Sequence, residues 1–233
     1  MDGEVVIKLV DITKAYGKIN ALRKINLEIY EGEIFGLFGS NGAGKSTFIS
    51  IVSTLIRPTE GQVTIKGFNT CKEANKVKPL IGFVPQDIAL YQSLSAIENL
   101  RFWSSIYKVS RKLCDERINE ALSFVDLQSR AKDKVSEYSG GMKRRLNMAV
   151  ALLHKPEILI LDEPTAGVDM QSRKYMLDAI KEYKKRGTTI IFTSHYLDEM
   201  KELCDRVAIL NDGRITSIMD KKQLATSSEF NLL

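Results

Sequence analysis

The segment 39–47 carries the most specific chemical pattern in the chain, a glycine-rich run that ends in a lysine and two hydroxyl residues. Its members are Gly39, Ser40, Asn41, Gly42, Ala43, Gly44, Lys45, Ser46 and Thr47. Glycine has no Cβ, so successive backbone N–H groups can turn toward one bound anion. In this pattern the lysine reaches the β- and γ-phosphates of a nucleotide, and the serine hydroxyl binds Mg²⁺. We therefore predict a site for the phosphates of a nucleotide and for Mg²⁺ here, rather than a glycine-rich turn that binds nothing.

Two acids, Asp162 and Glu163, directly follow the apolar run 158–161. A continuous apolar run is typical of a strand buried on both faces of a parallel sheet, and ligands collect at the carboxyl ends of such strands. Neighbouring residues on a strand point in different directions. We therefore expect Asp162 to hold Mg²⁺ and Glu163 to act as general base for a water that attacks the γ-phosphate. An acid pair that only caps the next loop is the alternative.

Three single residues stand where they can complete this site. Gln86 follows a predicted strand, and its amide can bridge Mg²⁺ and the attacking water. His195 ends another predicted strand and can donate to the γ-phosphate, although a purely structural histidine is equally compatible with that position. Tyr16 lies upstream of the glycine loop and can stack on an adenine ring, although a turn tyrosine packed on the sheet would also explain it.

A second anion site is predicted at Ser139, Gly140 and Gly141, because these residues open a helix whose first N–H groups are free. A long insertion separates this segment from the phosphate loop along the chain. Two phosphate-binding segments with one set of catalytic acids indicate that two copies pair head to tail and hold nucleotide between them.

The elements that must position these residues follow from the hydrophobic pattern. An apolar run at 34–38 predicts a strand before the loop, and Phe48, Ile51, Val52 and Leu55 predict one face of a helix that ends at Pro58. Alternation predicts antiparallel strands within 4–30 and further strands at 63–65 and 81–83. A capping box at Ser95 and Glu98 opens the first of several helices between 87 and 155. A helix at 172–185, a strand at 188–194 and a hairpin at 206–219 complete the pattern.

We therefore predict an α/β fold: a P-loop NTPase core with a mixed or parallel sheet flanked by helices, an N-terminal antiparallel β subdomain and an inserted α-helical subdomain. Residues 1–233 would form one domain, with the core at about 1–86 and 156–233 and the helical insertion at about 87–155. The last ten residues carry no clear pattern.

Composition excludes several classes of protein. Hydrophobic residues are 44% of the chain and charged residues 27%, values that are ordinary for a globular domain. No stretch approaches the roughly 20 apolar residues of a membrane span, and no signal peptide is recognisable. Cys71, Cys114 and Cys204 are far apart and odd in number, which predicts free thiols in a reducing compartment. The net charge of +5 is better explained by solvated lysines than by a nucleic-acid or anionic-membrane surface.

Taken in order, these motifs resemble those of the ATP-binding subunit of ABC transporters over nearly the whole chain. The matches are Tyr16 to the adenine-stacking aromatic, 39–47 to Walker A, Gln86 to the Q-loop, 138–142 to the signature, 158–163 to Walker B with its catalytic glutamate, 166–169 to the D-loop and His195 to the switch histidine. Tyr138 and Met142 replace the ends of the usual LSGGQ signature, and Ala166 replaces the usual D-loop serine. These variants are similar to those of the ABC-2-type exporter branch, some members of which carry an extra C-terminal domain.

The resemblance implies a mechanism and partners. Two subunits, identical or paralogous, would close on two ATP·Mg²⁺. Lys45 and His195 of one copy and residues 139–141 of the other would hold each γ-phosphate. The helical insertion, hinged at Gln86, would move an integral membrane permease at the cytoplasmic face of the membrane, with 88–94 as the expected contact surface.

Two other classes of ATPase or kinase share some of these motifs. A non-transport ABC ATPase acting on nucleic acid or the ribosome would usually carry a long coiled coil or a second fused ATPase unit, and the chain shows neither. A plain P-loop kinase would leave residues 139–141 and His195 without a role. We therefore expect no nucleic-acid partner.

Overall fold

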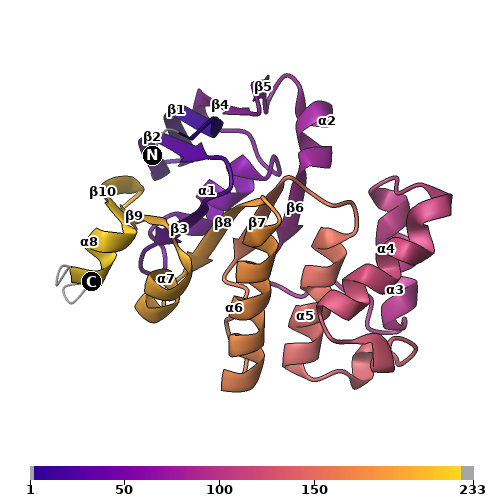
Figure 1. Cartoon of the computed structure of the whole chain (residues 1–233). Helices are drawn as coiled ribbons and strands as arrows, with labels where there is room; N and C mark the ends of the chain where they lie inside the picture. The colour runs from indigo at the N-terminus through magenta and orange to yellow at the C-terminus, as the bar shows by residue number, and fades with distance from the viewer. Residues whose placement is uncertain (1–2, 227–233) are drawn as a thin grey trace.

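The computed structural model describes residues 3–226, which form a two-sheet core with a helical lobe beside it (Figure 1). The larger sheet has six strands in the order β10-β9-β3-β8-β7-β6. Its strands are β3 (Ile34–Phe38), β6 (Ile81–Val84), β7 (Ile158–Asp162), β8 (Thr189–Ser194), β9 (Arg206–Asn211) and β10 (Arg214–Asp220). All neighbours pair in parallel except β10, which runs antiparallel to β9. The prediction of a mixed or parallel sheet is confirmed, and the sheet is mixed.

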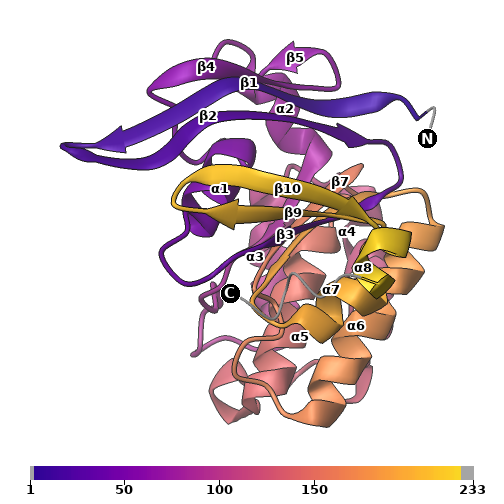
Figure 2. The same ribbon diagram turned by 90° about the vertical axis from the view of Figure 1, so that its left-hand side faces the viewer.

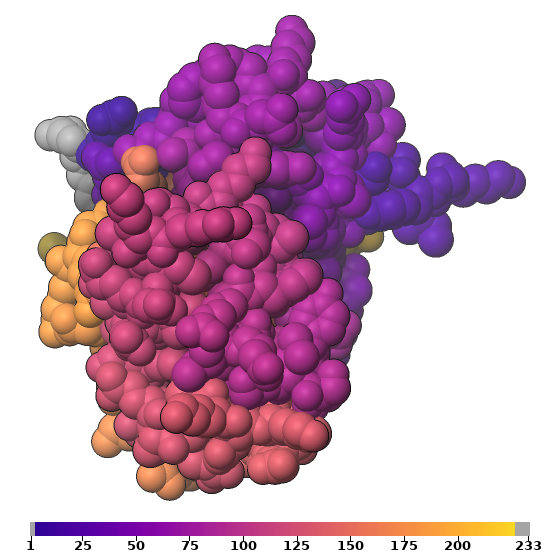
Figure 3. Space-filling model, turned by 90° about the vertical axis from the view of Figure 1, so that its right-hand side faces the viewer, coloured from indigo at the N-terminus to yellow at the C-terminus, as the bar shows by residue number. Residues whose placement is uncertain are grey.

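The smaller sheet is antiparallel and has the order β2-β1-β4-β5. It consists of β1 (Val5–Tyr16), β2 (Ile19–Tyr30), β4 (Glu60–Ile65) and β5 (Phe68–Asn69). Figure 2 shows it lying above the larger sheet, with the tip of the β1–β2 hairpin projecting beyond the body, and Figure 3 shows the same projection from the opposite side. Helix α1 (Lys45–Val52) joins the two sheets, because its buried side chains Phe48, Ile49, Ile51 and Val52 share one apolar core with residues of both.

The helical lobe contains α3 (Ala96–Ile106), α4 (Arg111–Phe124) and α5 (Gly140–Leu152), which stand together on the right of Figure 1. It has an apolar cluster of its own, built around Leu100, Leu122 and Leu146. The predicted capping box is present, since Ser95 Oγ accepts from Glu98 N–H while the Glu98 carboxylate accepts from Ser95 N–H. The 3₁₀ turns at Gln128–Arg130 and Val135–Glu137 complete this lobe. The short helix α2 (Ala74–Val77) lies outside it, contacts β5 and is followed by a 3₁₀ turn at Lys78–Leu80 that leads into β6.

The other face of the larger sheet is covered by α6 (Met170–Lys185) and α7 (Leu197–Leu203), and α8 (Lys221–Thr226) follows β10. Their apolar residues pack with the strands in a second cluster. The predicted unit β7–α6–β8 is confirmed as a parallel crossover. Within residues 3–226, no helix is long and apolar enough to cross a membrane.

One helix boundary predicted from the sequence is wrong. Helix α1 ends at Val52 and not at Pro58, because Thr54 adopts a left-handed backbone conformation with φ of 65°. Leu55, predicted on the buried face of that helix, is therefore 62% exposed. The hairpin at 206–219 is confirmed, but its first strand also pairs in parallel with β3, which the sequence did not indicate. Most of the last ten residues lie outside the described part of the chain.

Candidate active site

The phosphate loop connects β3 to α1 in a conformation that two of its glycines make possible. A Cβ on Gly39 would lie 2.4 Å from the backbone oxygen of Leu210, so no larger residue fits there. Gly44 is the N-cap of α1 and has φ of 110°, a value that L side chains rarely adopt. The loop therefore connects a strand to a helix as predicted, and the N-terminus of α1 lies at the end of the loop, where its free N–H groups favour an anion.

The ammonium of Lys45 is buried and has three oxygen partners. Its Nζ donates to the backbone oxygens of Gly39 at 2.8 Å and Ser40 at 3.2 Å, and it lies 3.3 Å from Glu163 Oε1 in an ion pair. Two of these partners are neutral carbonyls and one is the predicted general base. A polyphosphate at the loop would offer the ammonium charged oxygens. Such a ligand can therefore replace Glu163 as the ion-pair partner of Lys45.

The two acids after β7 are held by one threonine of the neighbouring strand. Thr193 Oγ1 donates to Asp162 Oδ1 at 2.8 Å and accepts from the backbone N–H of Glu163 at 2.9 Å. Burial raises the pKa of Asp162, an effect that the hydrogen bond from Thr193 partly opposes. The two side chains have different partners, Thr193 for Asp162 and Lys45 with His195 for Glu163. Strand alternation does not apply to this pair, because β7 ends at Asp162 and Glu163 lies in the left-handed region with φ of 44°.

His195 completes the group around Glu163. Its Nδ1 lies 3.2 Å from Glu163 Oε2, while the other carboxylate oxygen of Glu163 faces Lys45. The imidazole is exposed on its outer side, and the ring of Tyr196 lies 4.1 Å from it, centroid to centroid. The structure thus brings together Lys45, the adjacent acids Asp162 and Glu163, and His195, which come from three segments far apart in the sequence.

Gln86 follows β6 at the surface, and its backbone oxygen accepts a hydrogen bond from the Arg144 guanidinium. The same guanidinium reaches the backbone oxygen of Ala166 in the D-loop at 3.5 Å. Burial lowers the pKa of Arg144. Sequence reasoning missed this residue. Its only signal was its place in the second turn of the helix that the signature segment opens.

The signature segment 139–141 has local hydrogen bonds and a close neighbour in α6. Ser139 Oγ caps α5 by accepting from Met142 N–H at 3.2 Å, and a Cβ on Gly141 would lie 2.1 Å from Ser172 Oγ. Tyr138, the unusual first residue of the motif, is buried and its hydroxyl donates to the backbone oxygen of Arg130 at 2.7 Å. Among the described residues, no hydrogen bond or ion pair joins this segment to the phosphate loop or to the acids.

Tyr16 ends β1 at the projecting hairpin, and in the described part of the chain no hydrogen bond or ion pair joins it to the other predicted site residues. Tyr16 is 51% exposed. The ammonium of Lys14 lies 5.1 Å from the ring centroid, which is a cation–π distance. The ring remains open to stacking by a planar ligand.

The residues predicted to hold Mg²⁺ fit that ion by their chemistry. The Ser46 hydroxyl, the Asp162 carboxylate and the Gln86 amide are all oxygen donors, which Mg²⁺ prefers together with water and phosphate oxygens. Ser46 is exposed in the first turn of α1, and Asp162 is 6% exposed. Within residues 3–226 there is no group of three or more His, Cys, Asp or Glu that could bind a metal by itself. A site of this kind would draw on phosphate oxygens for its remaining ligands.

The comparison with known families decides the identity of this arrangement. The family model described as ABC transporter matches residues 22–166, a range that contains the loop, Gln86, the signature segment and both acids. The chain belongs to the ABC transporter family. It is an ATP-binding subunit with ATPase activity, as the resemblance of its motifs implied.

Two relatives and one solved structure illustrate the match. A linearmycin resistance ATP-binding protein of Bacillus subtilis is 46% identical over 221 residues, which cover 95% of this chain and 71% of that protein. A daunorubicin resistance ATP-binding protein of Streptomyces coeruleorubidus is 36% identical over 202 residues, which cover 87% of this chain and 64% of that protein. A dimeric ATP-binding cassette in a post-hydrolysis state, bound to ADP and Pi, is 31% identical with a TM-score of 0.84, covering 92% of this chain and 98% of that one. The chain therefore spans about two thirds of the length of these curated relatives.

Proposed function

We propose that this chain energises the export of a substrate through a separate integral membrane permease, at the cytoplasmic face of the membrane, and that it works as a head-to-tail pair. The observation that carries the proposal is the position of Glu163 between Lys45 and His195, in a chain whose signature segment makes no contact with that site among the described residues. Relatives named as linearmycin resistance and daunorubicin resistance ATP-binding proteins support export. We place the core at about 1–86 and 156–233, and the moving helical insertion at about 87–155.

The chemistry follows from these positions. On nucleotide binding, Lys45 exchanges Glu163 and the loop carbonyls for the β- and γ-phosphate oxygens, while Tyr16 stacks on the adenine. Glu163, released on that side, orients the attacking water and accepts its proton. His195 donates to the γ-phosphate. Bound Mg²⁺, held by Ser46, Asp162 and Gln86, would neutralise charge on the phosphates. Positioning and charge neutralisation are most of what phosphoryl transfer requires.

The second half of each site comes from the partner copy, identical or paralogous. Residues 139–141 begin α5, and Gly140 is exposed, with no atom within 4 Å of an added Cβ, so their N–H groups can approach an anion from outside. Driving closure from 1:99 to 99:1 requires about 5.5 kcal/mol of differential binding. Two to four hydrogen bonds to charged phosphate, at about 1.5–3 kcal/mol each, supply that amount. Hydrolysis and release of phosphate remove the bridging charge, and the pair opens.

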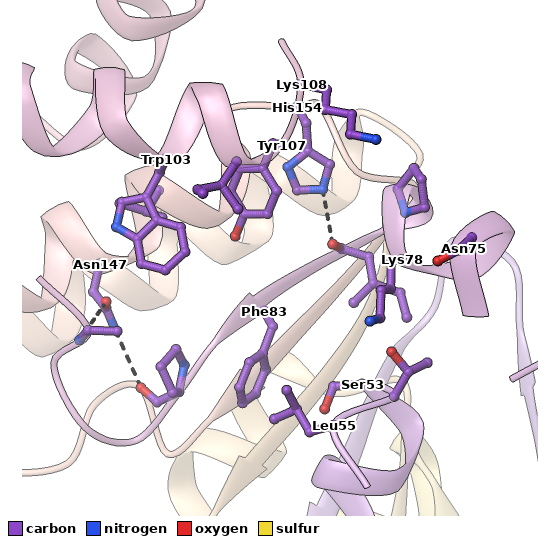
Figure 4. Close-up of a pocket in the computed structure, with 17 residues that line it drawn as sticks. Ser53, Leu55, Asn75, Lys78, Phe83, Trp103, Tyr107, Lys108, Asn147 and His154 are labelled. Carbon is purple, nitrogen blue, oxygen red and sulfur yellow. Dashed lines mark hydrogen bonds between the residues drawn. The ribbon is translucent and has the colours of Figure 1, made fainter. Parts of the chain in front are cut away.

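We propose that the permease docks in the cleft between the core and the helical lobe. The cleft has a volume of about 810 Å³. Figure 4 shows Trp103, Tyr107 and His154 of the lobe facing Phe83 and Leu55 of the core across it. The predicted contact stretch 88–94 contributes Ala89 to the lining.

The lining of the cleft indicates the kind of segment that would bind. Leu55 and Phe83 of the core and Trp103 and Tyr107 of the lobe present apolar and aromatic surface to it. The occupant that we propose is therefore a short permease segment with apolar side chains. Its movement with the lobe would couple hydrolysis to transport.

The test is co-purification from membranes of cells that produce the tagged chain. The wild type is expected to retain one polytopic membrane protein, identified by mass spectrometry. Leu55→Glu puts a charge on the cleft wall and should lose that protein while ATP binding is retained. Ile218→Glu changes an apolar side chain of β10 that is 40% exposed and outside the cleft, and should behave as wild type. Equal recovery with Leu55→Glu would exclude the cleft as the docking site, and the absence of any membrane protein with wild type would contradict the transport proposal.

A further inference from the structure

Three successive residues at the end of β8 face three different groups. Thr193 contacts the acids after β7, Ser194 contacts Glu199 in α7, and His195 contacts Glu163. The alternation of side chains along a strand produces this division, since Thr193 and Ser194 leave the sheet on opposite faces. The position of His195 is therefore set by residues on both sides of the sheet. Asp162 and Glu163 lie on only one of these sides.

On the other side stands a buried carboxylate that the reaction does not use. The side chain of Glu199 is 0% exposed. Its Oε2 accepts from Ser194 Oγ at 2.5 Å, and its Oε1 forms an ion pair with Arg173 Nε at 2.6 Å. A buried charge is tolerated only when it is paired and hydrogen-bonded, so these three residues form one unit.

This unit reaches His195 through Tyr196. Ser194 Oγ donates its single proton to Glu199, which leaves its lone pairs to accept from the backbone N–H of Tyr196 at 3.0 Å. The Arg173 guanidinium lies 4.7 Å from the centroid of the Tyr196 ring, whose other neighbour is the His195 imidazole. Hence both the backbone on each side of His195 and the ring beside it are fixed by the Glu199 unit.

The unit also connects His195 to the D-loop. Arg173 lies in the first turn of α6, and its backbone N–H donates to the oxygen of Asp169, the N-cap residue and last residue of the D-loop. A displacement of the start of α6 would therefore act on Arg173, then on Glu199 and Tyr196, and so on the imidazole.

We propose that Glu199, with Arg173 and Ser194, is a positioning residue for His195 that ties the imidazole to the start of α6. The inference rests on the role proposed above for His195. Glu199 contacts neither the phosphate loop nor the acids, and it affects turnover only through the placement of the imidazole.

The experiment is a double-mutant cycle on the full chain, with ATP turnover and KM for ATP as readouts. Glu199→Gln keeps the size of the side chain and removes its charge. A displaced catalytic group costs up to about a hundredfold in rate, so we expect kcat to fall roughly 10- to 100-fold with KM for ATP little changed. His195→Ala should also lower kcat. In the His195→Ala chain, adding Glu199→Gln should change kcat by less than about twofold, because the group that Glu199 positions is absent.

An ion pair of the same chemistry lies at the opposite, amino-terminal end of the parallel strands, where β3 and β9 begin. Arg206 NH1 contacts Glu33 Oε1 at 3.0 Å, and its guanidinium lies 4.8 Å from the centroid of the Tyr30 ring. Glu33 precedes β3, whereas the phosphate loop follows it. Glu33→Gln should therefore affect stability as Glu199→Gln does, yet leave kcat unchanged in both backgrounds.

Ser194→Ala provides a second route to the same test if Glu199→Gln fails to fold, because it leaves the buried ion pair with Arg173 intact. It should give the same pattern in the cycle. A fall in kcat by equal factors with and without His195 would overturn the inference, for either variant. A normal kcat in His195→Ala would instead contradict the proposed role of His195, so the two failures are distinguishable.

Discussion

The sharpest consequence of the site geometry concerns Glu163→Gln, which removes a charge while preserving the shape of the side chain. Two effects are expected because the carboxylate has two partners. As the predicted general base, its loss should lower ATP turnover about 10²–10⁴-fold. As the partner of Lys45, its loss should free the ammonium for phosphate, so nucleotide affinity should rise.

The size of the second effect follows from the Lys45–Glu163 distance of 3.3 Å. At an effective dielectric constant of about 20, two opposite unit charges at that distance attract by about 5 kcal/mol. Lys45 keeps its two carbonyl partners in the variant, and the amide of glutamine still accepts a hydrogen bond. We therefore expect about 1–2 kcal/mol of this attraction to appear as tighter binding, which is a roughly 5- to 30-fold lower Kd for Mg·ATP.

The assay combines phosphate release with calorimetric titration by Mg·ATP. Glu157→Gln is the matched control, because Glu157 precedes β7 as Glu163 follows it and also pairs with a lysine, Lys66, at 3.0 Å. Its side chain is 53% exposed, so turnover and affinity should both stay at the wild-type values. Turnover of Glu163→Gln within about threefold of wild type would refute its role as base. Lost turnover with unchanged affinity would refute the exchange of partners at Lys45.

Three further outcomes test the account at other points. Gly141→Ala would bring a Cβ to 2.1 Å from Ser172 Oγ, and this overpacking should destabilise the chain by about 1–3 kcal/mol and lower its Tm. An added Cβ at Gly140 has nothing within 4 Å, so Gly140→Ala should melt as wild type but lose ATP-dependent pairing. Equal Tm values for the two variants would contradict the packing of α5 on α6. Tyr16→Ala should weaken ATP binding by about 1–3 kcal/mol and Tyr16→Phe should not, and equal affinities by calorimetry would exclude adenine stacking. Cys204 is buried, and burial raises the pKa of its thiol. A thiol reagent should therefore modify Cys71 and Cys114 in the native chain, and Cys204 only after unfolding. Modification of Cys204 in the native chain would contradict its place between β3 and α7.

The sequence predicted the parts of the site whose chemistry is local. The phosphate loop, the buried run of β7 and the capping box at Ser95 each depend on residues within a few positions of one another, and each is present in the structure. Their side chains and backbone conformations are set by neighbours along the chain, which is why a pattern can reveal them.

The remainder depends on contacts between distant segments. Arg173 and Glu199 are separate in sequence and pair only because α6 and α7 pack together. The carbonyl partners of Arg144 come from the Q-loop and the D-loop, and no spacing rule connects them to α5. The spacing of Leu55 from Phe48, Ile51 and Val52 fits the buried face of α1, but the left-handed backbone at Thr54 ends the helix before Leu55. These features follow from tertiary packing, which periodicity does not contain.

Nucleotide is expected to join two copies of the chain, each supplying what the site of the other lacks. The most direct test is the mass of the Glu163→Gln chain in solution at saturating Mg·ATP, measured by light scattering after size exclusion. We expect the mass of two chains with Mg·ATP, one chain without it, and one chain under both conditions when Gly140→Ala is added. A Glu163→Gln chain that stays monomeric at saturating Mg·ATP, in solution and in its membrane assembly, would contradict it.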